Sequence, residues 1–139
     1  MKKTWQQKLD IDQQPQVKKS DKDFAGIRNG QLMLIPTPRM VDAYIRQIPR
    51  GKQVDPQTMR RDLAAENHAE VTCPLTTGIF IRIAAEAAWE QYQKGTPLKQ
   101  LTPFWRVINE KSPTAKKLSF GTEFLKKMRE GERLTANSQ

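Results

Sequence analysis

The sequence predicts a mainly α-helical domain with a small β hairpin, of the winged helix-turn-helix class. The first observation is an almost wholly apolar helical pattern over residues 72–89, in which Leu75, Ile79 and Ile83 recur every fourth position. The second is a shorter helical pattern just before it, separated by only a few residues. The third is a basic segment after it, where aromatic and branched residues follow a proline. Two closely joined helices followed by a hairpin are typical of this class.

Length and charge narrow the class of protein. The chain has 139 residues, the size of one domain, and a formal net charge of +9. This charge favours an anionic partner, with nucleic acid ahead of a membrane surface, although a merely soluble basic protein is the other interpretation. The single cysteine excludes an internal disulfide and suits a reducing cytoplasm. No apolar run has membrane-spanning length and the chain starts without a signal-peptide core, so we expect a soluble cytoplasmic protein.

The chain divides into an arm, a domain and a tail. Residues 1–35 are expected to form a flexible basic arm, residues 36–133 the winged helix-turn-helix domain, and residues 134–139 a frayed tail. Pro15 interrupts any helix that begins near Thr4. The arm is expected either to dock Trp5 or Phe24 on the domain or to remain mobile. Residues 31–35 are apolar and are predicted to form a short strand.

Two helices begin with the same local signal. Thr37 and Asp55 each precede a proline. The Thr or Asp side chain can cap the helix, and the proline can occupy the first turn, where a backbone N–H donor is not needed. The first helix is predicted to end before Pro49, and the second near His68. The helix over residues 72–89 follows after a short connection. We expect it to be buried, with only a narrow polar ridge at Arg82, Glu86 and Glu90 meeting water.

The basic segment is predicted to form the wing. Residues 102–108 are expected to be one strand and residues 116–120 its partner, joined by a polar turn. Gly121 and Thr122 then begin a last helix over residues 123–130. Wings lie along phosphates, so Lys116 and Lys117 are expected to contact a nucleic-acid backbone, with a solvated basic face as the alternative.

Gly78 requires a physical reason, because glycine inside a helix costs about 1 kcal/mol relative to alanine. One explanation is that DNA lies against the first turns of the helix, where Thr76 and Thr77 also stand and backbone donors point outward. The other is that the preceding helix crosses at this point. We favour helix packing, because the flanking Ile79 and Phe80 are expected to be core residues.

Several motifs in this order resemble a known family. They resemble the C-terminal DNA-binding domain of the methylated-DNA–protein cysteine methyltransferases and their alkyltransferase-like relatives. The segments that carry the resemblance are Ile48-Pro49-Arg50-Gly51-Lys52, the glycine-containing helix, Pro103-Phe104-Trp105-Arg106-Val107-Ile108, and the glycine-led last helix over residues 121–132. The resemblance implies a DNA-binding helix that uses the minor groove. It covers roughly residues 36–133.

The departures from the family pattern argue against its chemistry. Phe104 stands at the position of the alkyl-acceptor cysteine, and Trp105 at that of the histidine beside it. A thiolate is the nucleophile in alkyl transfer and neither ring replaces it, so we expect no enzyme activity. Leu75 aligns with the arginine that fills the vacated base position, and residues 54–57 replace the family's tyrosine-containing turn. Whether the protein flips bases is therefore left undecided by the sequence.

Three candidate sites each have a plainer interpretation. Cys73, at a helix start with His68 nearby, is either a nucleophile or a small packed residue. Phe104 and Trp105 are either a platform for an unstacked base or two core residues. Arg106 is either a DNA contact or an anchor for the segment after the central helix. One histidine and one cysteine make a poor zinc site, so no metal and no cofactor are expected.

We therefore expect a non-enzymatic DNA-binding protein that resembles alkyltransferase-like proteins and recognises alkylated or damaged bases in DNA repair. The alternatives are a structural or interaction protein that keeps the fold without DNA binding, and an enzyme that uses Cys73. Protein partners and oligomeric state are left open. The residues expected to contact DNA are Thr76, Thr77, Gly78, Arg82, Arg106, Lys116 and Lys117.

Overall fold

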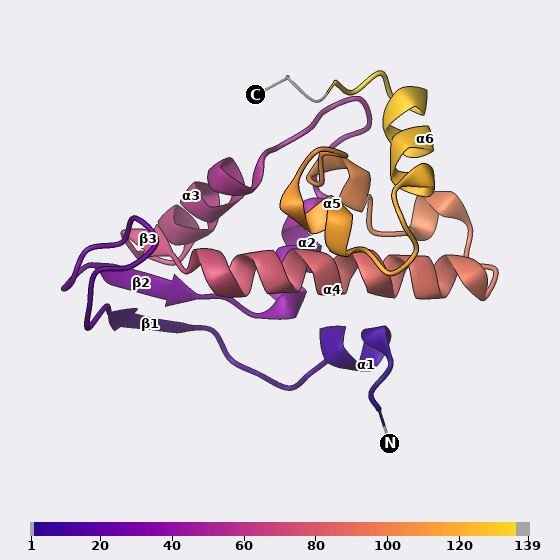
Figure 1. Ribbon diagram of the computed structural model, residues 1–139. Coiled ribbons are helices and arrows are strands. Elements are labelled where there is room, and N and C mark those ends of the chain that lie inside the picture. The colour runs from indigo at the N-terminus through magenta and orange to yellow at the C-terminus, as the bar shows by residue number, and fades with distance from the viewer. Residues whose placement is uncertain (1, 136–139) are drawn as a thin grey trace.

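The protein is mainly helical, with one small sheet at one end of its longest helix (Figure 1). The computed structural model describes residues 2–135. The elements in chain order are α1 (Trp5–Leu9), β1 (Gln16–Lys19), β2 (Leu32–Ile35), α2 (Pro38–Arg46), α3 (Pro56–Glu66), β3 (Val71–Thr72), α4 (Pro74–Gln93), the 3-10 segments η1 (Leu98–Gln100) and η2 (Phe104–Arg106), α5 (Pro113–Lys117) and α6 (Glu123–Gly131). Among these described residues no helix is both long and apolar enough to cross a membrane.

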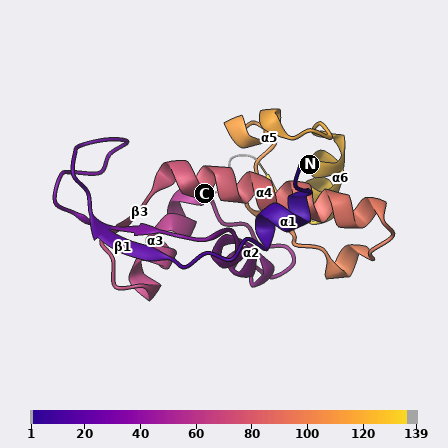
Figure 2. The ribbon, with the colours of Figure 1, turned by 90° about the horizontal axis from the view of Figure 1, so that it is seen from below.

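Helix α4 runs through the middle of the molecule, and the other elements pack around it. In Figure 1, α5 and α6 lie above α4, whereas α1 and β1 lie below it. Figure 2, seen from below, shows α2 on one side of α4 and α5 on the other. Elements that precede α4 and elements that follow it therefore both pack against this helix.

Residues 2–35 contain the regular elements α1, β1 and β2 rather than forming an extended arm. Strand β1 pairs antiparallel with β2, and β3 pairs parallel with β2, so the sheet order is β1-β2-β3. Strand β2 confirms the short strand expected at residues 31–35. Thr4 caps α1 in a capping box with Gln7, and the Glu90 carboxylate accepts the backbone N–H groups of Trp5 and Gln6 at 3.1 and 3.0 Å. Of the two expected forms of the arm, docking through Trp5 is therefore the one observed.

The two predicted helix starts are confirmed. The Thr37 side chain accepts a hydrogen bond from the Met40 N–H, and Asp55 accepts one from the Thr58 N–H at 2.7 Å. A proline occupies the first position of both helices, where a missing N–H costs nothing. Cys73 precedes α4 without capping it through its side chain. Local chemistry was sufficient to determine where α2 and α3 begin.

The core lies between α2, α3, α4, η2 and α6. Its fully buried side chains include Ile45, Met59, Ile81, Phe104 and Leu125, one from each of these elements. They form one contiguous cluster, which is the expected arrangement for a domain of this size.

The prediction of a β wing is wrong, because the regular elements within residues 102–120 are helical. Residues 104–106 form η2 instead of a strand, and α5 occupies the place of the partner strand. Ser112 caps α5 by accepting from the Ala115 N–H, and Pro113 takes the first helical position. This is the same start signal that begins α2 and α3. The last helix is confirmed as α6.

The end of α6 is held against the domain. Residues 136–139, most of the expected tail, lie outside the described residues. The carbonyl of Thr135 accepts hydrogen bonds from Arg129 and from the Gln53 amide, each at 3.0 Å. The chain therefore stays attached to the domain up to Thr135.

Candidate functional site

A hollow of about 690 Å³ runs along the N-terminal half of α4. We call it the α4 groove. Figure 1 shows its two flanking helices, α1 and α5, on opposite sides of α4. The residues that line it are Trp5 and Lys8 of α1, Pro74, Leu75, Gly78, Ile79, Arg82 and Ile83 of α4, and Thr114 and Lys117 of α5. Three residues expected to contact DNA, Gly78, Arg82 and Lys117, are therefore brought together here.

The floor of the α4 groove exposes large apolar side chains. Leu75 is 63% exposed and Ile79, one helical turn later, is 57% exposed. The expectation that water meets only a polar ridge of this helix is therefore wrong. Glu86, expected to belong to that ridge, is 1% exposed. Its buried carboxylate is satisfied inside the protein, because the Ser119 N–H donates to one oxygen at 2.8 Å and the Ser119 hydroxyl donates to the other.

Gly78 lies in this floor with open space above it. Apart from its chain neighbours and the adjacent backbone of α4, no atom of the described residues stands within 4 Å of the position that a Cβ would take. The favoured explanation for this glycine, close packing of the preceding helix, is therefore wrong. Because Gly78 has no side chain, it leaves a recess in the floor of the α4 groove between Leu75 and Ile79.

Cations form the rim of the α4 groove. The Arg82 guanidinium lies 5.3 Å from the centre of the Trp5 ring, and the Lys8 ammonium lies 4.1 Å from it. Arg82 also pairs with Glu86, its Nε standing 3.4 Å from a carboxylate oxygen. Lys117 is exposed at the end of α5. No carboxylate is among the described residues that line the groove. The hollow is therefore apolar at its floor and positive at its edges.

Thr76 and Thr77, both expected to contact DNA, instead bond at the start of their own helix. Thr77 is fully buried, and its hydroxyl donates to the Cys73 carbonyl at 2.7 Å. It cannot reach a ligand, so its expected DNA contact is wrong. Thr76 is half-buried, and its hydroxyl points to the same carbonyl at 3.4 Å. Both hydroxyls satisfy the first turn of α4, a common use of threonine near a helix start.

Arg106 is an internal anchor. Its guanidinium pairs with Glu132 at 2.9 Å and donates to the Ile48 carbonyl at 2.8 Å. These bonds join η2 to the end of α6 and to the segment after α2. A guanidinium held in this way is not available to DNA, which corrects the expectation of a contact there.

Phe104 and Trp105 are core residues, and the expected base platform is wrong. They are 0% and 3% exposed, with their rings edge to face at 5.3 Å between centroids. Phe104 also contacts Phe120 and Phe124. The Trp105 indole donates to Glu132 at 2.7 Å, so its polar end is satisfied inside the protein.

A second cationic feature lies beside the groove. Lys116 and Lys117 end α5 and are exposed, as expected. Three more exposed lysines stand before α5 and on α6. We call the five the C-terminal lysine surface: Lys111, Lys116, Lys117, Lys126 and Lys127. No ion pair involves these side chains within residues 2–135.

Cys73 is a packed residue at the start of α4. It is 6% exposed and belongs to a small cluster with Ile27 and Met33. Its backbone N–H donates to the Leu34 carbonyl at 2.9 Å. Within residues 2–135 no three histidine, cysteine, aspartate or glutamate side chains are grouped as metal ligands would be.

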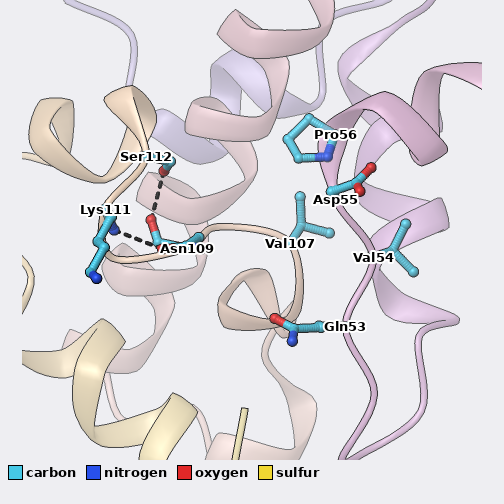
Figure 3. Close-up of a pocket in the computed structure, with 8 residues that line it drawn as sticks. All are labelled: Gln53, Val54, Asp55, Pro56, Val107, Asn109, Lys111 and Ser112. Atoms are coloured by element: carbon cyan, nitrogen blue, oxygen red, sulfur yellow. Dashed lines mark hydrogen bonds between the residues drawn. The ribbon is translucent and has the colours of Figure 1, made fainter. Parts of the chain in front are cut away.

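A smaller hollow of about 260 Å³ lies between the start of α3 and the segment after η2 (Figure 3). Its polar groups already serve the local backbone. Asp55 caps α3, and the Asn109 side chain accepts from the Lys111 N–H at 2.8 Å. The Ser112 hydroxyl donates to the Asn109 carbonyl at 2.7 Å. The hollow therefore offers few groups to a ligand, and the α4 groove is the stronger candidate.

Comparisons with protein-family models, with curated proteins and with solved structures found no match to this chain.

Proposed function

We propose that this protein binds duplex DNA without catalysis, as alkyltransferase-like proteins do, through phosphate contacts of the C-terminal lysine surface. The observation that carries the proposal is five exposed lysines on α5, on α6 and just before α5, none ion-paired within the described residues. Helices α5 and α6 lie on the same side of α4 in Figure 2. The net charge of +9 supports the same partner.

In this proposal α3 and α4 form a helix-turn-helix, and α5 takes the place of the wing. Phosphate contacts provide affinity and position the protein, but they do not distinguish bases. The burial of Phe104 and Trp105 supports binding without base flipping and with little preference for a lesion. A cytoplasmic location is part of the same proposal.

The test is a titration of a short duplex at several salt concentrations. Each phosphate contact lowers log affinity by about 0.9 per log unit of salt. Replacing Lys116 and Lys117 with alanine is expected to reduce this slope by about two units. Lys18 and Lys19 on β1 are also exposed, so replacing them with alanine provides the matched control.

An affinity that does not change with salt contradicts the proposal. Equal slopes for the two double variants would contradict the placement of the site. Repeating the titration with an O6-alkylguanine in the duplex measures lesion preference, and we expect the same affinity with and without it.

The alternative, an interaction protein, is favoured by one separate observation. The α4 groove exposes Leu75 and Ile79, which phosphate contacts do not use.

A further inference from the structure

We propose that the α4 groove binds an acidic amphipathic helix of a partner protein. This site is distinct from the proposed phosphate contacts and does not depend on DNA binding. The two surfaces share Lys117, at the end of α5.

The dimensions of the groove suit a short helix. Its floor runs from Pro74 to Ile83, which at 1.5 Å per residue is about 14 Å, or two to three helical turns. The walls are the helices α1 and α5. A bound helix places anchors at positions i, i+3 or i+4, and i+7 along such a length.

The floor offers apolar contacts for these anchors. Leu75 and Ile79 are more than half exposed, and Ile83 continues the same row one turn later. Between them, Gly78 leaves open space where a side chain would otherwise stand. A large apolar side chain of the partner fits over this glycine. Contiguous exposed apolar surface of this kind marks interaction sites on soluble proteins.

The rim determines the charge of the partner. Lys8, Arg82 and Lys117 surround the floor, and no carboxylate is among the described lining residues. Arg82 pairs with Glu86 through Nε, and its side chain is 36% exposed, so a carboxylate of a partner can approach the guanidinium from solvent. Carboxylates on both sides of an apolar stripe complement this arrangement.

The other occupants match the groove less well. Duplex DNA supplies phosphates for the rim but would leave Leu75 and Ile79 against a charged backbone. A second copy of this chain, packed through the same face, would bring its own Lys8, Arg82 and Lys117 against the first set. An acidic amphipathic helix satisfies both the floor and the rim.

The experiment uses a labelled synthetic peptide of about 14 residues, with leucines at i, i+4 and i+7 and glutamates beside that stripe. Fluorescence anisotropy with the full chain is expected to show binding. A peptide in which every glutamate is replaced by lysine is expected not to bind. Equal affinity for the two peptides, or no binding of the acidic one, overturns the proposal.

Variants of the floor test the location. Leu75→Ser is expected to weaken peptide binding by about thirtyfold, because it removes a central apolar anchor. Leu98→Ser is the matched control, since Leu98 is 42% exposed on η1 and does not line the groove. Gly78→Phe fills the floor and is expected to abolish binding while circular dichroism and thermal unfolding show a folded protein. Equal effects of Leu75→Ser and Leu98→Ser would overturn the assignment.

Two further measurements separate this site from the proposed function. Replacing Lys126 and Lys127 with alanine is expected to weaken DNA binding and to leave peptide affinity unchanged, whereas Leu75→Ser is expected to do the reverse. A loss of DNA binding in Leu75→Ser would instead assign the groove to DNA. A dimer in sedimentation experiments that Leu75→Ser dissociates would assign it to a second copy. Either result contradicts the proposal.

Discussion

The indole Nε1 of Trp105 donates a hydrogen bond of 2.7 Å to a carboxylate oxygen of Glu132. The same carboxylate also accepts hydrogen bonds from the Arg106 guanidinium at 2.9 Å and from the Gly51 N–H at 2.8 Å. One buried side chain thus joins η2, the end of α6 and the turn after α2. These are three of the segments that carry the resemblance to the methyltransferase domain.

Glu132→Ala is expected to lower the free energy of unfolding by about 3 kcal/mol, because it leaves the Arg106 charge and the Trp105 N–H without their partner. Urea denaturation measures the loss. Glu130→Ala provides the control, since Glu130 is exposed on α6 and its replacement is expected to change stability by about 0.5 kcal/mol or less. A loss for Glu132→Ala no larger than that of the control contradicts the structural role.

The stability of the protein is expected to fall in acid partly through Glu132. Burial raises the pKa of this carboxyl, but the hydrogen bonds from Arg106, Gly51 and Trp105 outweigh burial and hold the pKa below its ordinary value of 4.5. The folded state therefore favours the carboxylate. Its contribution is fully present above pH 4.5, the value for the unfolded chain, and is lost as the pH falls through the lower folded pKa.

Urea midpoints measured across this acid range for the parent and for Glu132→Gln test the assignment. Glutamine keeps the size of the side chain but does not titrate, so the stability difference between the two proteins is expected to shrink as the pH falls. A difference that stays constant from neutral pH into acid would show that Glu132 does not titrate as proposed.

Gly78→Ala is expected to raise the free energy of unfolding by about 0.5–1 kcal/mol. Gly78 lies inside α4, where alanine loses less backbone entropy on folding. Beyond the adjacent backbone of α4 and the chain neighbours, a Cβ there meets no atom of the described residues within 4 Å. Gly51→Ala is the contrasting variant, because the φ of +82° at Gly51 strains any other residue. Thermal unfolding of both proteins provides the measurement. A Gly78→Ala protein less stable than the parent would mean that a neighbour does approach this position.

Phe104→Cys is expected not to create alkyl-transfer activity. The side chain at this position is fully buried, so the new thiol would lie in apolar surroundings that disfavour the reactive thiolate. The loss of the ring from the core is also expected to cost about 3 kcal/mol. Mass spectrometry after incubation with an O6-alkylguanine duplex is expected to show no adduct on the variant or on the parent. An adduct on Cys73 would place a reactive site at the start of α4.

Part of the fold was predictable because its causes lie within one helical turn. Thr37 and Asp55 each bond to an N–H three residues later, and the following proline has its preferred helical φ, so α2 and α3 begin where the sequence predicts. The same signal at Ser112 and Pro113 begins α5. The aromatic and branched residues on either side of it are typical of strands, which is why residues 102–120 are expected to form a hairpin and the signal in the turn is missed.

The sequence by itself therefore determined the mainly helical class, the starts of α2 and α3 and the excess of positive charge. Only the tertiary structure decided how residues 102–120 fold and which face of α4 is open. Successive residues of a strand point to opposite faces, whereas the turn of η2 lets both Phe104 and Trp105 enter one core. Leu75 and Ile81 are equally apolar in the sequence, but only Ile81 faces packed neighbours. Burial depends on which segments fold back over a helix, and a single helical pattern does not contain that information.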